Sequence, residues 1–120
     1  MYSGPNAGWA YCNIDPSHFE RVFILGPGHD VDFPNCALTL AKYWETPLGN
    51  VEVDHETQKE IYDKGDFLYI NKATDENEHS LELHLPFVQK VFKHSGEQHD
   101  FKLVPIMVGT LSEKKEKEFG

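Results

Sequence analysis

A histidine and an aspartate follow a short apolar run in the first quarter of the chain. Residues 22–25, Val-Phe-Ile-Leu, are wholly apolar, and the run stops at Gly26-Pro27-Gly28 before His29 and Asp30. Such a run predicts a strand buried on both faces, and ligands of open α/β sheets bind beyond the carboxyl ends of strands. His29 is therefore a candidate metal ligand or general base, since neutral imidazole serves both roles. The alternative is a loop histidine that bonds backbone groups.

A second cluster places acidic residues around a histidine, in the order Glu78, His79, Ser80, Leu81, Glu82. On a helix, Glu78 and Glu82 share a face, and His79 lies beside them. Two carboxylates and an imidazole could orient a metal-bound histidine by hydrogen bonding to the ring nitrogen that does not bind the metal. The alternative is an acidic helix start that the helix dipole favours. The order His-Glu-x-x-His is absent, so this is not a zinc-protease helix.

Residues 4–12 form a third segment of interest, with the sequence Gly-Pro-Asn-Ala-Gly-Trp-Ala-Tyr-Cys. Two glycines, a proline and two aromatic residues indicate a tight loop beside a pocket. The remaining histidines stand among polar residues, and we interpret each as a surface or local capping residue: His18, His55, His84, His94 and His99.

The elements that must position these residues alternate between strands and helices. Residues 103–109 predict a second buried strand, in which Pro105 indicates an edge, a bulge or a strand start. Residues 37–53 predict a strand, a turn at 46–50 and a second strand, with hairpin character.

Helices are predicted over residues 56–64, residues 78–93 and from Ser112 onwards. In the second helix an apolar stripe of Leu81, Leu85, Val88 and Phe92 marks the buried face. Pro86 predicts a kink or a break in that helix. The order along the chain is that of an α/β protein, and we predict one domain over residues 1–120.

Charge and cysteine usage limit the classes of partner. The formal net charge is −9 over 120 residues, with no basic stripe, which argues against nucleic acid and anionic membranes as partners. The longest apolar runs fall far short of a bilayer span. Cys12 and Cys36 are expected to be reduced thiols of a cytoplasmic protein, with a nuclear location also open.

Taken together, these segments resemble the Memo family, whose fold is similar to that of the class III non-haem iron dioxygenases. The resemblance is carried, in order along the chain, by residues 5–12, 21–29, 46–48, 74–86, 104–109 and 111–113. Its most specific part is Glu-His-Ser-Leu-Glu after an acidic run, at residues 78–82.

The resemblance implies a pocket of which this chain carries only a part. Asn6 stands where the family has a pocket histidine, and His29 matches the second pocket histidine. Tyr11 matches the pocket tyrosine, and Glu78, His79 and Glu82 would be supporting residues. The family's other ligands lie in a C-terminal half beyond this sequence. The resemblance therefore implies iron or copper only in a complete member, because one imidazole does not hold a metal.

The resemblance also implies gaps in the fold. The apolar strand expected before Gly4 is missing, and residues 13–21 are too few for the crossover helix that a parallel sheet needs. We therefore expect a partial three-layer α/β sandwich with a mainly parallel sheet, lacking the family's first strand, first helix and C-terminal half. Such a chain is expected to be marginally stable, with exposed apolar edges that associate.

Three functions remain open at this point. The chain could resemble a metal-dependent oxidoreductase or dioxygenase, or a binding module of cell-motility signalling that receives phosphotyrosine peptides or a receptor tail. It could also be an inert product of a shortened gene. The sequence favours a non-catalytic, incomplete member of the family, because only one of the expected metal ligands is present.

Overall fold

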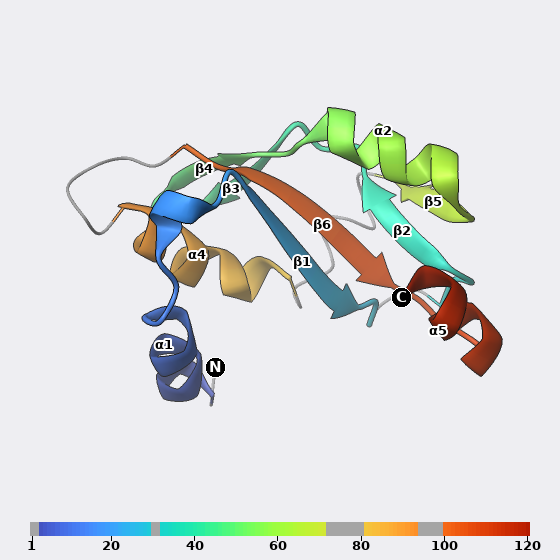
Figure 1. Cartoon of the computed structure of the whole chain (residues 1–120), viewed down its shortest axis with the longest axis horizontal. Helices are drawn as coiled ribbons and strands as arrows, with labels where there is room; N and C mark the ends of the chain where they lie inside the picture. Colours follow the sequence, from blue (N-terminus) through green and yellow to red (C-terminus); the bar gives the residue numbers. More distant parts are fainter. Residues whose placement is uncertain (1–2, 30–31, 72–80, 94–99) are drawn as a thin grey trace.

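A four-stranded sheet forms the centre of the part of the chain that the structure describes. This computed structural model describes residues 3–29, 32–71, 81–93 and 100–120. The strand order is β1 (Arg21–Pro27), β6 (Lys102–Val108), β2 (Cys36–Thr39) and β5 (Phe67–Ile70). β1 and β6 are parallel, as are β2 and β5, whereas β2 and β6 are antiparallel. The prediction of an α/β protein with a mainly parallel sheet is confirmed (Figure 1).

A separate hairpin joins β3 (Tyr43–Thr46) to β4 (Gly49–Glu52), which confirms the predicted turn at 46–50. The single strand predicted before that turn is wrong, because its first residues form β2 in the larger sheet and its last residues form β3. Thr46 Oγ1 accepts from the Leu48 N–H at 3.1 Å and donates to the Gly49 carbonyl at 2.8 Å, which closes the turn. Gly49 has a φ of +114°, a conformation that residues with a Cβ rarely adopt.

One face of the sheet is covered by α4 (Leu85–Lys93), which follows the 3₁₀ turn η2 (Glu82–His84). The predicted stripe is confirmed, because Leu81, Leu85, Val88 and Phe92 are each at most 3% exposed. Pro86 lies in the first turn of α4, where its missing N–H breaks no helical hydrogen bond. The predicted break is therefore where the helix begins, and residues 78–80 lie outside the described residues.

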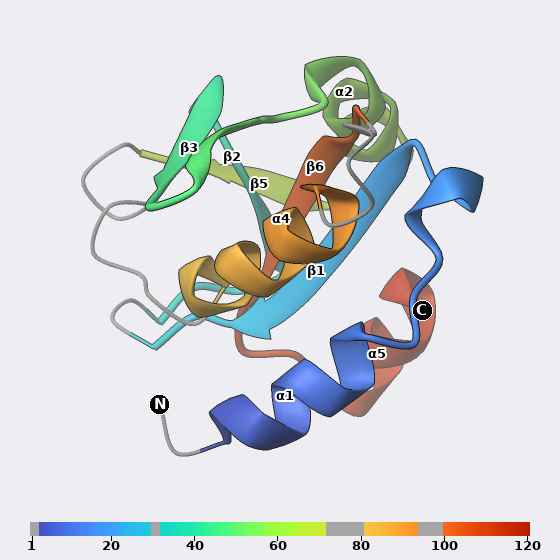
Figure 2. The ribbon, with the colours of Figure 1, turned by 90° about the vertical axis from the view of Figure 1, so that its left-hand side faces the viewer.

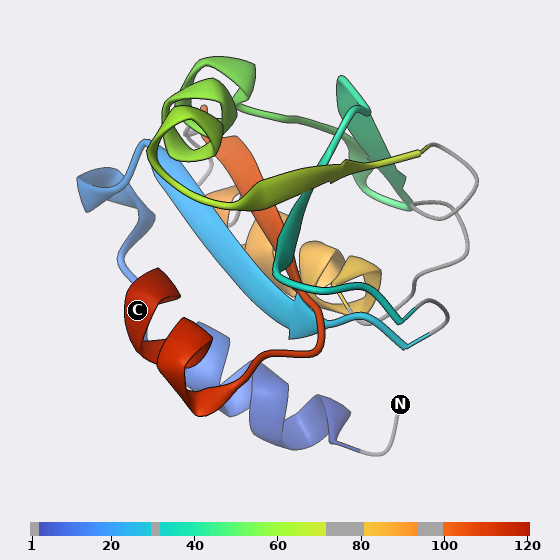
Figure 3. The same cartoon turned by 90° about the vertical axis from the view of Figure 1, so that its right-hand side faces the viewer.

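The opposite face is covered by α2 (His55–Lys64) and α5 (Glu113–Phe119). Each helix begins at a side-chain cap, since Asp54 accepts from the Thr57 N–H and Ser112 accepts from the Lys115 N–H. Side chains of α2 and α5 pack over a buried cluster of Cys36, Leu38, Val104 and Ile106. The sheet thus has helices on both faces, which Figures 2 and 3 show from two sides.

Two further predictions about the strands are wrong. β1 is not buried on both faces, because Phe23 is 49% and Leu25 is 64% exposed. The cause is that β1 lies at the edge of the sheet. β6, in contrast, is a central strand despite Pro105. The pairing of β6 with β2 ends at Ile106. No hydrogen bond to β2 is therefore required from Pro105, which has no N–H to donate.

Residues 4–12 are not a tight loop. They form α1 (Gly4–Tyr11), a helix in which Pro5 lies in the first turn and its missing N–H is tolerated. Within this described helix no residue is buried. A 3₁₀ turn, η1 (Pro16–His18), connects α1 to β1.

Strand β5 was not predicted at all. Among the described residues, no helix has the length and apolar character that crossing a bilayer requires.

Candidate functional site

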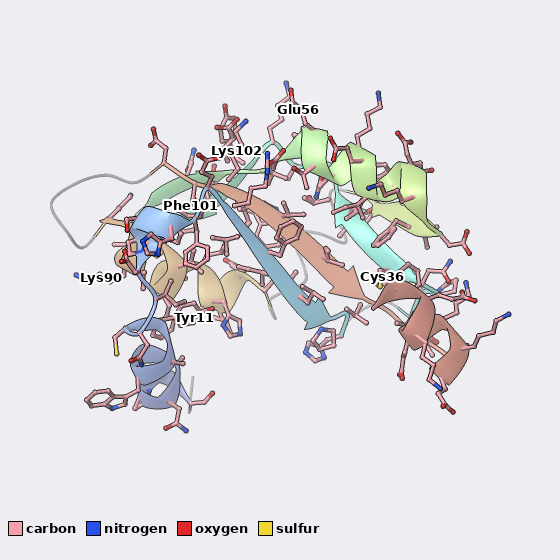
Figure 4. All side chains as sticks on the ribbon, viewed as in Figure 1. Tyr11, Cys36, Glu56, Lys90, Phe101 and Lys102 are labelled. Carbon is pink, nitrogen blue, oxygen red and sulfur yellow. The ribbon has the colours of Figure 1, made fainter. Side chains whose placement is uncertain are left out.

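Tyr11 lies at the end of α1 and contacts the start of the α4 segment (Figure 4). Its hydroxyl is 3.1 Å from Nδ1 of His84, and its ring stacks on Phe87 with centroids 5.5 Å apart. Burial raises the pKa of Tyr11, so the phenol keeps its proton. These contacts attach α1 to α4 through one aromatic side chain. His84 was expected to be a surface residue, and it is exposed, but it also bonds this distant partner.

An apolar recess of about 240 Å³ opens beside Tyr11, between the N-terminal segment, β1 and α4. Its walls are aromatic and branched side chains, with a single guanidinium among them: Tyr11, Ile14, Phe19, Arg21, Val91 and Phe92. Ile14 and Phe19 are 40% and 50% exposed, so the recess is open to solvent on this side. Such walls can receive an aromatic or aliphatic side chain.

Arg21 stands between this recess and a larger cleft of about 730 Å³. Its side chain is 54% exposed, and Nε donates to the buried carboxylate of Asp54 at 2.6 Å. Burial alone raises the pKa of Asp54, but the Thr57 N–H and Arg21 outweigh it and hold the pKa below its ordinary value. The same ion pair raises the pKa of Arg21, so the guanidinium keeps its charge.

The larger cleft has walls of both charge signs. Figure 4 labels three of its residues, Glu56, Phe101 and Lys102. Lys102 pairs with Glu52, also in the wall, at 3.6 Å between Nζ and Oε1. Opposite charges thus already pair within this cleft, and the recess beside Tyr11 is the more apolar of the two.

The residues predicted from the sequence are spread over several elements. Asn6 is exposed on α1, and His29 is exposed two residues beyond the end of β1. Tyr11 lies in the recess with Phe23, and from Phe23 to the end of β1 is about 13 Å at ~3.3 Å per residue. Tyr11 and His29 therefore belong to different ends of this strand. Glu82 is exposed in η2.

The other two predicted residues, Glu78 and His79, lie outside the described residues. Within the described residues, no three His, Cys, Asp or Glu side chains lie close enough to hold a metal ion. The donors that the structure describes therefore do not fit an iron or copper centre. Cys36 is a free, buried thiol, and burial raises its pKa, while Cys12 is free and exposed.

Sequence reasoning missed Arg21, Asp54 and Phe87. Asp54 carried a usable local signal, because an aspartate directly before a helix is a common N-cap. The Arg21–Asp54 pair and the Tyr11–Phe87 stack join residues that are far apart in the sequence. No local pattern encodes such contacts.

Comparison with known proteins gives consistent matches over the whole chain. A family model described as Memo-like protein matches residues 1–120. Protein MEMO1 of Xenopus laevis is 44% identical over 119 residues, which cover 99% of this chain and 39% of that protein. Protein MEMO1 of Homo sapiens is 41% identical with the same coverage. Protein memo-1 homolog of Caenorhabditis elegans is 37% identical, with 33% of its length covered. The chain thus spans about two fifths of the length of the MEMO1 relatives.

Proposed function

The chain belongs to the Memo-like protein family, and we propose that it is a non-catalytic member that binds peptides carrying phosphotyrosine. The proposal places this binding in cell-motility signalling, in the cytoplasm or nucleus, with a receptor tail as the natural source of such a peptide. It concerns recognition alone and requires no metal.

The observation that carries the proposal is the apolar recess beside Tyr11, with Arg21 in its wall. A phosphotyrosine side chain combines an aromatic ring with a dianionic phosphate. Rings stack favourably on aromatic walls such as Tyr11 and Phe19. A guanidinium is the side chain best suited to phosphate, because it offers parallel N–H donors and a permanent charge.

Arg21 has capacity for this role although it is paired with Asp54. The ion pair uses Nε, one of the five N–H donors of a guanidinium. The Asp54 side chain is buried and the Arg21 side chain is about half exposed, so Asp54 contacts the guanidinium on its protein-facing side. Asp54 would thus fix the guanidinium in place while its outer N–H groups face solvent.

Titration of a fluorescent phosphotyrosine peptide against the same peptide without phosphate tests the proposal. We expect micromolar binding that depends on the phosphate, and an at least tenfold loss in Arg21→Gln. Lys102→Gln is the matched control, because Lys102 lines the larger cleft and not the recess. This control should change the dissociation constant by less than about twofold, as expected for a charge outside the site.

Four outcomes would count against the proposal. The first is equal affinity for both peptides, and the second is a loss in Lys102→Gln as large as in Arg21→Gln. The third is near-stoichiometric iron or copper that this chain retains through gel filtration. That result would favour the alternative of a metal-dependent oxidoreductase, which we propose only for full-length members. Loss of peptide binding in His29→Ala but not in Arg21→Gln would move the site to the far end of β1.

A further inference from the structure

The larger cleft adjoins the recess beside Tyr11. Arg21 lines both cavities. Phe92 in the wall of the recess also packs on Phe101 in the wall of the cleft, with ring centroids 4.3 Å apart (Figure 4 labels Phe101). Side chains two residues apart on an extended peptide point the same way and are about 7 Å apart. A peptide with one side chain in the recess can therefore place a neighbouring side chain in the cleft.

The cleft has more acidic than basic groups in its wall, five carboxylates against three cations. The cations are already engaged. Arg21 and Lys102 each pair with a carboxylate of the wall, and Lys93 donates to a backbone carbonyl of the β3–β4 turn. The three other carboxylates are exposed, and none of them forms an ion pair with a described residue: Glu20, Glu56 and Asp100. The cleft thus has capacity for a further cation.

These carboxylates also oppose the phosphate that Arg21 would bind. Glu20 directly precedes Arg21 in the chain, and exposed charges act on one another over about 10 Å at 0.1 M salt. A ligand that brings a cation to the cleft replaces this repulsion with attraction. The net charge of −9 acts in the same direction at longer range, because an acidic protein attracts cationic ligands.

The walls of the cleft suit an organic cation better than a metal ion. Within the described residues, no three His, Cys, Asp or Glu side chains lie close enough together to hold a metal. Two aromatic residues line the cleft, Tyr43, which is 56% exposed, and the half-buried Phe101. Aromatic rings attract a guanidinium or an ammonium group that lies over their face. Arginine and lysine side chains combine such a group with an apolar stem.

We propose that the cleft binds an arginine or lysine side chain of the same peptide, about two residues from the phosphotyrosine. This inference rests on the proposed function and names the class of peptide that the site selects. The phosphotyrosine ring occupies the recess, Arg21 binds the phosphate, and the basic side chain lies beside Glu20 and Glu56. Peptides with acidic residues at these neighbouring positions are disfavoured.

Three fluorescent phosphotyrosine peptides test this preference. They are identical except at the positions two residues before and two residues after the phosphotyrosine, which are both arginine, both glutamine or both glutamate. The arginine peptide should bind about tenfold more tightly than the glutamate peptide. This ratio should shrink as the salt concentration rises, because salt screens exposed charges. The neutral glutamine peptide serves for the comparison of Arg21→Gln with Lys102→Gln.

A pair of double variants separates the cleft from the overall charge of the chain. Glu20→Gln/Glu56→Gln removes two carboxylates from the cleft. The matched control is Glu113→Gln/Glu116→Gln in the first turn of α5, which makes the same change in net charge and lines neither cavity. All four residues are exposed, so the fold should be unaffected. The ratio should fall from about tenfold to about twofold in the cleft variant and stay near tenfold in the control.

Two results would overturn this inference and leave the proposed function standing, provided that binding still depends on the phosphate. The first is equal affinity for the arginine and glutamate peptides. The second is an equal fall of the ratio in both double variants, because only the net charge of the chain would then act. Equal affinity for the arginine peptide with and without phosphate would instead overturn the proposed function, and this inference with it.

Discussion

Two helices, α4 and α1, lie close together and contribute differently to the fold. α4 buries Leu85, Val88 and Phe92 against the sheet, together with Gln89. α1 buries no residue, and its Trp9 is 74% exposed. The difference follows from the sequence of each helix, because α4 carries an apolar stripe at helical spacing and α1 carries two glycines, a proline and an asparagine.

This difference teaches where the stability of the molecule resides. A helix stabilises a fold mainly through the apolar face that it buries, and much less through its intrinsic propensity. α1 contributes one anchoring residue, Tyr11, and otherwise presents side chains to solvent. The α4 side is therefore expected to be the stable part, and the α1 side the part that is available for recognition.

The largest effect is expected from truncating the α4 stripe. Phe92 is 3% exposed and packs on Phe101 with ring centroids 4.3 Å apart. Phe92→Ala should lower the free energy of unfolding by about 3–5 kcal/mol, because it removes a buried ring and leaves a cavity. Denaturation in urea, followed by circular dichroism, measures this loss. If the variant unfolded at the same urea concentration as the parent chain, the α4 face would not be the stable part.

The contrast extends to how the helices begin. Asp54 caps α2 through the Thr57 N–H at 3.0 Å, whereas Ser3 makes no side-chain cap bond to α1. Asp54→Ala should lower the free energy of unfolding by about 1–2 kcal/mol, the usual loss of an N-cap. Ser3→Ala is the matched control at the uncapped helix and should have no measurable effect. Equal losses in the two variants would contradict the cap assignment.

The same carboxylate predicts a dependence on pH. The pKa of Asp54 in the folded chain lies below its ordinary value of 3.8, so the unfolded chain takes up this proton first as the pH falls. The stabilisation is therefore complete well above that ordinary value and is lost as the pH falls through the folded pKa. Urea unfolding at a series of acidic pH values should show a shallower acid loss in Asp54→Asn than in the parent chain.

Burial is not stabilising for every residue, and Gln58 tests this limit. Gln58 of α2 is 0% exposed, and neither its Nε2 nor its Oε1 has a hydrogen-bond partner among the described residues. An unpaired buried amide costs about 1–3 kcal/mol. Gln58→Met keeps the length of the side chain and removes the amide, so it should raise the free energy of unfolding by roughly 1–2 kcal/mol. A lower midpoint in urea would show that the amide has a partner in solution.

The sequence predicted best the elements whose signals are local. The stripe from Leu81 to Phe92, the cap at Ser112 and the turn at Gly49 each depend on residues within a few positions of one another, and each was confirmed. The family resemblance was also confirmed over residues 1–120. The roles of Asn6, Tyr11 and His29 as pocket residues stay predictions.

The errors fall where distant contacts decide. Whether β1 is buried on both faces depends on its place in the sheet, which a run of apolar residues does not encode. Pro105 is tolerated in a central strand because pairing with β2 stops at the next residue. β5 was missed because four residues, Phe-Leu-Tyr-Ile at 67–70, gain their strand structure from pairing with β2. The recess beside Tyr11 likewise assembles from three separate segments.

The smallest effect is expected at the junction between the two helices. Tyr11→Phe removes the hydroxyl that pairs with His84 and keeps the ring on Phe87. Because the hydrogen bond is exposed, its loss should lower the free energy of unfolding by less than about 1 kcal/mol. Tyr11→Ala removes the stack as well and should release α1 from α4, with increased proteolysis at residues 12–15 while the α4 face stays folded. If α1 is a separate unit, it can detach while the rest of the chain stays folded. Cooperative unfolding of the whole chain in Tyr11→Ala would instead mean that α1 and α4 belong to one stable unit.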